Sequence, residues 1–417
     1  MARLDFTPSP TVAALLNQLL DIYERRDGAP RQAVRVRLAE TAKAWPDYYS
    51  QTDPGPRLLA NEQLSQLARL DYLTLTWEPG QTDHLLETVT LAPDRTEPLY
   101  QLLARQPLAE QRRRLREMLL AERSHLSGWR RRAVEHCLTQ LRQHKSPSPF
   151  SLTNLDLNRD LLTLLQALPD QESRTETPYR VFSVRLFNDS KRFESLKEVA
   201  ARLARRHQPD WHDLPPPDVW REMGLVANPN HLYLYGPWRL VDSEGQLISL
   251  AEFYPSVGIP AGLAARLQQV KVEAEVVVCV ENLASFYELV RHRRHGLAAV
   301  CLWGNPAPVM RHLLRRLAAD LPEAVPLRLW ADIDYGGLNI LAQLRRLVSP
   351  RFTPWRMDDH TLDAFAKWGQ PLTPTDLRNL TRLRRHPDLA DMGHLIDHML
   401  LREIKLEQEA VVLDSAD

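Results

Sequence analysis

The stretch from about residue 270 onward alternates short apolar segments with helical ones, and this alternation constrains the fold more than any other feature. Segments 275–280, 298–303 and 327–331 are apolar and short, as expected of strands that are buried on both faces of a sheet. A helical pattern of apolar residues follows each of them. Because a βαβαβα order builds a parallel sheet flanked by helices, we predict an α/β region here.

Acidic residues follow two of these expected strands. Glu281 ends the first strand, while Asp332 and Asp334 follow the third and precede Gly336-Gly337, which lets the backbone turn closely. Ligands of such sheets bind beyond the carboxyl ends of the strands. Residues two apart at a strand end are expected to point the same way, so these carboxylates should converge.

Three converging carboxylates repel one another unless a cation lies between them. Oxygen-only ligands select a hard ion such as Mg²⁺ or Mn²⁺. Such an ion binds a phosphate oxygen and activates water. A lone glutamate at a strand end is more often a helix cap, but the combination is specific. We therefore predict Glu281, Asp332 and Asp334 as metal ligands and catalytic residues.

The first hundred residues have a different pattern. Helical spacing over 11–26 predicts one helix, 31–43 a second, and Asn61 is expected as the N-cap of a third. Apolar residues then recur with a period of two on either side of the turn residues 79–83, which predicts a β-hairpin. Three helices and a hairpin are the order of a winged helix, which either binds DNA or docks proteins, and we assign residues 1–97 to it.

Residues 98–178 are expected to form a helical arm and a linker, with nearly continuous helix over 98–145 interrupted only at Gly128. Residues 105–145 hold eleven basic and four acidic side chains. Such a stretch is either a solvated helix face or a surface that neutralises phosphates. On the second interpretation, the DNA-binding candidates are Arg112, Arg113, Arg130 and Arg131.

A central α/β module is expected over residues 179–265. It opens with a strand-like segment, 179–187, and Asp189 or Ser190 then caps a helix over 192–206. Lys191 and Arg192 lie at that helix start, where backbone amides and positive charge favour a phosphate. The alternative is an exposed pair without a ligand. A strand with a tight bend is expected over 232–240.

Composition excludes several classes of protein. No run of about 18 apolar residues is present, so no membrane span is expected. The N-terminus lacks the apolar stretch of a secretory signal, and we expect a cytoplasmic protein. Three widely spaced cysteines form neither a disulfide framework nor a CxxC metal site, and Cys279 and Cys301 are expected in the core. Lysine plus arginine equals aspartate plus glutamate, 53 against 53, so DNA would be held by local patches.

Four segments carry a resemblance to a known family. They are VVVCVENLASF around 277–286, LWADIDYGGLNILAQLR at 329–345, RMDDHTL at 356–362 and KLEQE at 405–409. The first two resemble the toprim signature of topoisomerases, primases and several nucleases. The last two make the chain more similar to the JetD (MksG) family of Wadjet defence subunits, whose toprim domain resembles that of the topoisomerase VI A subunit. LYQLLARQP at 99–107 and NDSKRFE at 188–194 also resemble that family.

The resemblance implies a C-terminal toprim domain over 266–417 and a metal-dependent endonuclease that cuts double-stranded plasmid DNA by metal-activated water. It also implies a homodimer that works with an SMC-like complex containing a kleisin and accessory subunits. The acidic triad of the family falls on Glu281, Asp332 and Asp334. Glu407 and Glu409 either add a ligand or support the structure, and structural support is favoured.

Two alternatives stay open at this point. A tyrosine transesterase would use a tyrosine nucleophile, for which Tyr233, Tyr235 and Tyr254 are available. A non-catalytic subunit would only bind DNA or dock other proteins. None of these tyrosines lies in a recognisable helix with a flanking arginine, so hydrolysis is favoured. The histidines on expected helices are interpreted as surface residues: His292, His295 and His312.

Overall fold

The computed structural model describes residues 6–26, 33–291 and 295–412. Its elements are mixed helices and strands, and they divide into two compact units. One unit comprises Met1–Ser124 with His136–Asn158, and the other comprises His125–Glu135 with Arg159–Asp417. Among the helices of the described ranges, none is both long and apolar enough to cross a membrane.

The first unit contains a three-stranded antiparallel sheet in the order β1-β3-β2. Its elements are α1 (Pro10–Arg25), β1 (Val34–Arg37), α2 (Gly55–Arg69), β2 (Leu73–Trp77) and β3 (Leu86–Leu91). The predicted hairpin is confirmed in β2 and β3. The helix expected over 31–43 is wrong, because Val34 and Val36 are buried alternately and pair with β3, and a 3₁₀ turn, Ala39–Ala44, follows. The winged-helix assignment stays a prediction.

Asn61 is not the N-cap of α2 but lies inside that helix, buried. Its side chain accepts a hydrogen bond from the Tyr48 hydroxyl at 2.9 Å and donates to the carbonyls of Asp83 and His84. The prediction was wrong because asparagine is common at helix starts, whereas here its amide holds the hairpin loop against the helix.

The arginine-rich region forms separate helices in place of one nearly continuous helix. They are α3 (Glu97–Leu102), α4 (Leu108–Arg123), α5 (Gly128–Arg142) and α6 (Leu155–Ala167). The first break falls at Ala104, which has a positive φ of 49°, shortly before Pro107. The second precedes Gly128, which also has a positive φ, 53°.

The segment expected as a strand at 179–187 is a helix, and that prediction is wrong. It forms α7 (Tyr179–Phe187), followed by α8 (Arg192–His207) and α9 (Pro216–Glu222), with β4 (Thr177–Pro178) and β5 (Leu225–Val226) pairing in parallel. Tyr179 and Phe182, three residues apart, both contact the ring of Phe193 at 5.2 and 5.4 Å. This helical spacing of packed rings overrides the alternating pattern of the segment.

A mixed six-stranded sheet, in the order β14-β13-β11-β12-β6-β9, organises the second unit. Its strands are β6 (His231–Tyr235), β9 (Val257–Pro260), β11 (Val276–Val280), β12 (Leu297–Cys301), β13 (Leu327–Trp330) and β14 (Phe352–Pro354). The last four are parallel to one another, which confirms the predicted βαβαβα region. β6 pairs antiparallel with both of its neighbours, β12 and β9. The sheet thus takes strands from both sides of residue 265, and the expected domain boundaries stay a prediction.

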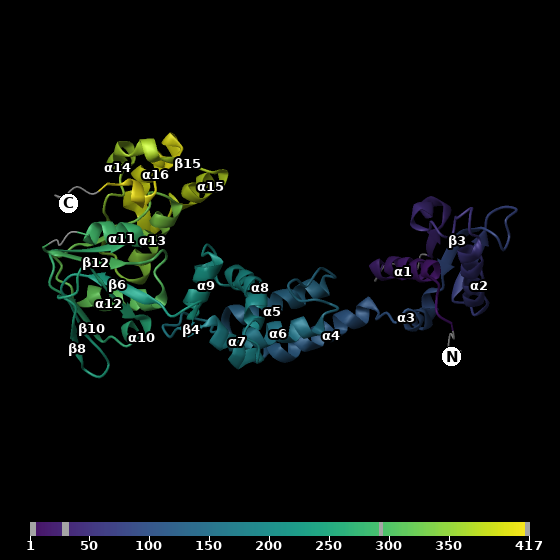
Figure 1. The fold of residues 1–417 in the computed structure, drawn as a ribbon. Coiled ribbons are helices and arrows are strands. Elements are labelled where there is room, and N and C mark those ends of the chain that lie inside the picture. Colours follow the sequence, from purple (N-terminus) through teal and green to yellow (C-terminus); the bar gives the residue numbers. More distant parts are fainter. Residues whose placement is uncertain (1–5, 27–32, 292–294, 413–417) are drawn as a thin grey trace. The chain divides into compact units, whose positions relative to one another are not determined.

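Helices connect the parallel strands. They are α11 (Leu283–Val290), α12 (Pro308–Asp320) and α13 (Tyr335–Leu347). Figure 1 shows α11 and α12 on opposite sides of β12 and β6. The bend expected within 232–240 falls at Gly236, with φ +107°, where the chain leaves β6 and enters β7 (Trp238–Val241). β7 lies between β8 (Leu247–Ser249) and β10 (Gln269–Val272) in a second small sheet, and α10 (Ala261–Ala264) follows β9.

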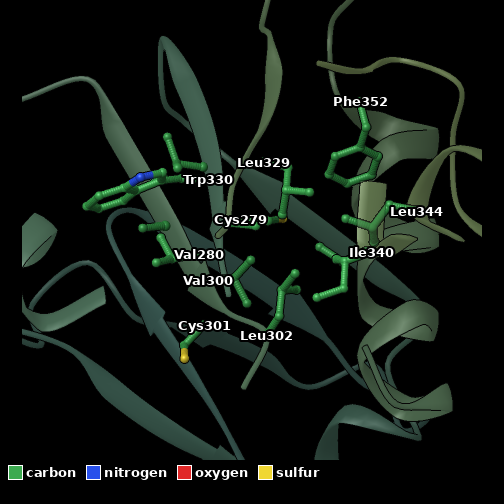
Figure 2. Close-up of a cluster of buried hydrophobic side chains, with 14 of the residues drawn as sticks. Cys279, Val280, Val300, Cys301, Leu302, Leu329, Trp330, Ile340, Leu344 and Phe352 are labelled. Atoms are coloured by element: carbon green, nitrogen blue, oxygen red, sulfur yellow. The ribbon is translucent and has the colours of Figure 1, made fainter. Parts of the chain in front are cut away.

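The core of this unit lies between the six-stranded sheet and its helices. Figure 2 shows side chains of three adjacent strands, Cys279, Val300 and Leu329, beside Ile340 and Leu344 of α13. Full burial of one such aliphatic side chain stabilises a protein by roughly 1.5–3 kcal/mol. The strands that carry the acidic residues are therefore firmly packed. Cys279 and Cys301 are buried, as predicted.

The remaining C-terminal elements return the chain to the sheet. They are α14 (Asp359–Ala364), β15 (Gln370–Pro371), α15 (Pro374–Leu383), α16 (Gly393–Arg402), β16 (Ile404–Lys405) and a 3₁₀ turn, Gln408–Ala410. β15 and β16 pair with each other. Ile333 and Leu406 then exchange two backbone hydrogen bonds of 2.9 and 3.1 Å. This bridge places residues 407–409 beside the carboxyl end of β13.

Candidate metal centre

The parallel strands end level with one another, and this brings the acidic residues together. In the register of the sheet, Val280 lies opposite both Cys301 and Trp330, the last residues of their strands. The backbone N–H of Glu281 donates to the Trp330 carbonyl at 3.0 Å. The Glu281 carboxylate in turn accepts a hydrogen bond from the backbone N–H of Asp332 at 3.1 Å. The first and third strand ends are thereby tied directly.

Asp332 and Asp334 have different hydrogen-bond partners. Asp334 is the N-cap of α13, and its carboxylate accepts from the Gly337 N–H at 2.8 Å. Asp332 accepts from the backbone N–H of Gln408 at 2.6 Å. A Cβ at Gly337 would lie 2.1 Å from the Asp332 carbonyl oxygen, so only glycine fits this approach. The predicted close turn at Gly337 is confirmed.

Gln408 joins the C-terminal segment to both strand ends. Its side chain is almost fully buried. The amide nitrogen donates to the Trp330 carbonyl at 2.9 Å, and the amide oxygen accepts from the Asn282 N–H at 3.0 Å. Together with its backbone bond to Asp332, these contacts fix residues 407–409 at the sheet edge. The KLEQE segment includes this residue, but no local pattern reveals a contact 126 residues away.

Glu407 and Glu409 lie beside Asp332. One carboxylate oxygen from each of the three residues lies within 4.8 Å of the other two, a spacing that suits shared coordination of one ion. Within the described parts of the chain, this group contains neither Glu281 nor Asp334. Glu409 also accepts a hydrogen bond from the Asn282 side chain. Glu409 thus combines a structural contact with a position suited to ligation, and Glu407 shares that position.

The electrostatics of this edge favour protonation or a bound cation. Burial is the largest cause that raises the pKa of Glu281 to about 8, and the charge of Asp332 is the next. Burial also raises the pKa of Asp332 to about 7, against the hydrogen bond from Gln408, which lowers it. The nearby carboxylates of Asp334, Glu407 and Glu409 raise that pKa further. A divalent cation would relieve this repulsion without protons.

The predicted DNA-binding arginines all contact other protein groups. Arg112 lies 3.0 Å from a ring nitrogen of His144, Arg113 bonds Glu110 and Glu117, and Arg131 bonds Glu135. Arg113 and Arg131 are exposed on their helices, and Arg112 is half-buried. Arg130 is buried, donates to the carbonyls of Leu165, Gln166 and Leu168, and pairs with Asp170. Burial gives Arg130 a structural role at the end of α6 in place of the expected phosphate contact.

The start of α8 is also occupied by protein groups. Neither Asp189 nor Ser190 is its N-cap, which is Lys191, and the Asp189 carboxylate accepts the Lys191 N–H at 2.8 Å. The first-turn N–H of Phe193 donates instead to the Ser183 hydroxyl at 3.0 Å, and Arg192 pairs with Asp160. Lys191 itself is exposed. A phosphate site here stays a prediction.

The other candidate side chains are spread over the second unit. Tyr235 is buried, Tyr233 is half-buried, and the exposed Tyr254 donates to the Arg291 carbonyl at 2.6 Å. His295 is exposed, as predicted, and His292 lies outside the described residues. The surface prediction for His312 is wrong, because that side chain is buried against the Leu267 carbonyl at 3.0 Å, and burial lowers its pKa.

The fold and site define a class: an α/β protein with a cluster of carboxylates at the carboxyl edge of its parallel strands. A family model described as "Wadjet protein JetD, C-terminal" matches residues 246–417, which include the whole candidate centre. A curated Wadjet protein JetD from Bacillus cereus (strain Q1) is 24% identical over 408 residues, which cover 95% of this chain and 98% of that protein. The chain is thus similar to JetD of the Wadjet defence system, through the family model over its C-terminal region and through this relative over nearly its whole length.

Proposed function

We propose that this chain is a metal-dependent DNA endonuclease, the subunit of a Wadjet system that cuts plasmid DNA. The observation that carries the proposal is the cluster of carboxylates on a rigid sheet edge, inside the region that the JetD family model matches. Residues 266–417 would then be a toprim catalytic domain. Its substrate would be the phosphodiester backbone of double-stranded DNA.

The donor set fits Mg²⁺ or Mn²⁺. Asp332, Glu407 and Glu409 would hold the ion, since their oxygens are mutually close and a hard divalent cation prefers carboxylate oxygens. Glu281 and Asp334 add negative charge at the same edge. When bound, the ion would polarise a phosphate oxygen and stabilise the charge that develops on the leaving oxygen.

The side chains around the ion have separate tasks in the proposed reaction. Water attacks phosphorus, one P–O bond forms and one breaks, and a proton must leave the attacking water. Glu281 would accept this proton, because its carboxylate lies at the same sheet edge, where it accepts the Asp332 N–H at 3.1 Å. Gln408 would orient Asp332 through its N–H, and Asp334 would fix the start of α13.

The partners are part of the proposal. We infer that the chain works as a homodimer with an SMC-like complex, including a kleisin and accessory subunits, as the resemblance to JetD implies. With 53 basic and 53 acidic residues, its DNA contacts would be local. The surfaces proposed for DNA are the N-terminal winged-helix region, the half-buried Arg112, and the exposed Arg113, Arg131 and Lys191.

Cleavage of closed-circular plasmid tests this function. The wild type, Glu281→Ala and Glu288→Ala would each be combined with the partner complex and Mg²⁺ or Mn²⁺. Glu288 is an exposed glutamate of α11 that pairs with Arg291, and it serves as the matched control. We expect cleavage by the wild type and Glu288→Ala and none by Glu281→Ala. Equal cutting by all three would refute the proposed site.

The same reactions separate hydrolysis from tyrosine chemistry. A tyrosine transesterase leaves a covalent protein–DNA adduct, which denaturing electrophoresis detects as DNA that migrates with protein. Hydrolysis leaves free ends, and we expect no adduct at any stage. An adduct that disappears in a Tyr233→Phe or Tyr254→Phe variant would favour the transesterase instead.

A further inference from the structure

Three aromatic side chains form a surface at the same edge of the six-stranded sheet. Tyr233 belongs to β6, Tyr287 to α11, and Trp303 follows β12. The Tyr233 ring centroid lies 5.8 Å from that of Trp303 and 6.5 Å from that of Tyr287. Trp303 is 55% exposed and Tyr287 is 40% exposed. We call this group the aromatic surface.

The backbone holds Trp303 in a conformation that a bulky residue rarely adopts. Its φ is +56°, in the left-handed region, and Gly304 follows with φ +83°. The Gly304 N–H donates to the Glu281 carbonyl at 3.1 Å, and the Trp303 carbonyl accepts from Arg221 at 3.3 Å. The chain thus maintains an uncommon conformation that leaves an indole in solvent, and such conformations cluster at binding sites.

The aromatic surface continues directly from the candidate metal centre. The Gly304–Glu281 contact joins the two, and β12 lies next to β11 in the sheet, about 4.8 Å away. If one phosphate of a polymer lay at the carboxylates, the neighbouring unit of that polymer would therefore lie against the exposed aromatic rings. A nucleic acid has both groups that this arrangement suits, a phosphodiester for the ion and a flat aromatic ring for the indole.

A cavity beside Trp303 indicates how much of a nucleotide is enclosed. It measures about 100 Å³ and is lined by Trp303, Arg221, Asn230 and His231 among others. Sites that enclose a whole small molecule are larger, roughly 300–1,000 Å³. The cavity is too small to enclose a nucleotide. The aromatic surface is therefore an open platform for stacking, as in proteins that bind single strands.

We propose that the aromatic surface stacks an unpaired nucleobase of the DNA next to the phosphate that is cut. The choice of ligand rests on the proposed nuclease function. The stacking is independent of base identity, because every base has an aromatic face. DNA with a short unpaired bubble then binds more tightly than fully paired DNA of the same length. This preference for the bubble depends on the Trp303 side chain.

Binding without cleavage tests this inference. Affinities of the full chain for a bubble duplex and a paired duplex are measured in EDTA by fluorescence anisotropy, for Trp303→Ala, Trp303→Phe and Trp368→Ala. Trp368 is another exposed indole, 47% against 55% for Trp303, which stacks on Phe365 and serves as the matched control. Since stacking changes affinity by about 10-fold or more per base, Trp303→Ala should weaken bubble binding by about that factor. Paired DNA should change little, and Trp303→Phe should be intermediate.

A base analogue gives a second measurement. The bubble carries 2-aminopurine, whose emission falls when its ring stacks on another aromatic ring. We expect quenching by the wild type and by Trp368→Ala, and none by Trp303→Ala. Thermal unfolding confirms that the variants fold. Asp332→Asn should keep the quenching although it loses cleavage, so failure of the nuclease proposal and failure of this one are distinguishable.

Three results would overturn the inference. Trp303→Ala could bind the bubble within twofold of the wild type, or it could lose bubble and paired DNA equally. It could also leave DNA binding intact while it dissociates a dimer in sedimentation, which would assign the surface to a second copy of the chain.

Discussion

The carboxyl edge of the six-stranded sheet and the arginine-rich helices are both clusters of like charge in the sequence, but the protein treats them differently. Arg113 bonds two glutamates, Arg131 bonds one, and Arg130 is buried against carbonyls and Asp170. At the sheet edge, by contrast, burial and then the charges of neighbouring carboxylates raise the pKa values of Glu281 and Asp332. A charge cluster that the protein balances internally stabilises the fold, whereas one that it leaves in repulsion indicates a ligand of opposite charge.

The strongest test of this contrast removes a charge from the sheet edge. Asp332→Asn keeps the size of the side chain and an oxygen that can accept from Gln408, but it takes away the carboxylate shared with Glu407 and Glu409. We expect plasmid cleavage by the assembled system to fall by about a thousandfold, the upper range for loss of one electrostatic group. Gel assays of plasmid linearisation measure it.

Retained cleavage in Asp332→Asn would contradict the assignment. Asp363→Asn is the control, because Asp363 is a partly exposed aspartate that pairs with Arg402 and His398 on other elements. Its variant should cut as the wild type does.

The second test addresses the arginines. Arg130→Ala leaves Asp170 and the last carbonyls of α6 without their buried partner, so the free energy of unfolding should fall by about 3 kcal/mol. Arg131→Ala, one residue away, removes an exposed ion pair with Glu135. It should leave the free energy of unfolding unchanged within error. Denaturant unfolding of the two variants compares them. Equal stability would mean that Arg130 is not the anchor described above.

Local patterns were sufficient for the parallel strands of the six-stranded sheet. Short apolar segments, two of them followed by acidic residues, gave β11 to β13 and the location of Glu281 and Asp332, because strand identity there depends on composition and period alone. Where packing overrides the period, the prediction failed. The segment 179–187 became α7 because its rings meet Phe193, and Asn61 became a buried anchor of a loop.

The candidate site was predictable in its strands but not in its full composition. Glu407 and Glu409 reach Asp332 only because Leu406 pairs with Ile333 and Gln408 is buried between two strand ends. These contacts join residues more than 70 positions apart, and no spacing within the KLEQE segment encodes them. The same holds for Arg130, whose burial depends on the end of α6, a separate helix.

A third test examines the residue that sequence reasoning missed. Gln408→Ala keeps the backbone N–H that Asp332 accepts, but it leaves the Asn282 N–H without its partner. It also removes one of the two donors to the Trp330 carbonyl, which keeps the bond from the Glu281 N–H. The free energy of unfolding should fall by about 2 kcal/mol. Urea unfolding measures this change, with Gln370→Ala in the exposed β15 as the control. Cleavage should also drop about 10-fold or more, because Gln408 supports a metal ligand.

The smallest expected effect is stabilisation of the folded chain by the ion itself. It compares the sheet edge with the arginine-rich helices in one measurement. A ligand that binds only the folded chain stabilises it by RT ln(1 + [L]/Kd), which is about 1.4 kcal/mol when free Mn²⁺ is about ten times Kd. Titration of Mn²⁺ during thermal unfolding should therefore raise the Tm of the wild type and of Arg131→Ala by the same amount. Asp332→Asn should show no shift, since the repulsion that the ion relieves is reduced and its ligand is gone. If Asp332→Asn is stabilised as strongly as the wild type, Mn²⁺ binds elsewhere, and the repelling carboxylates have a purely structural origin.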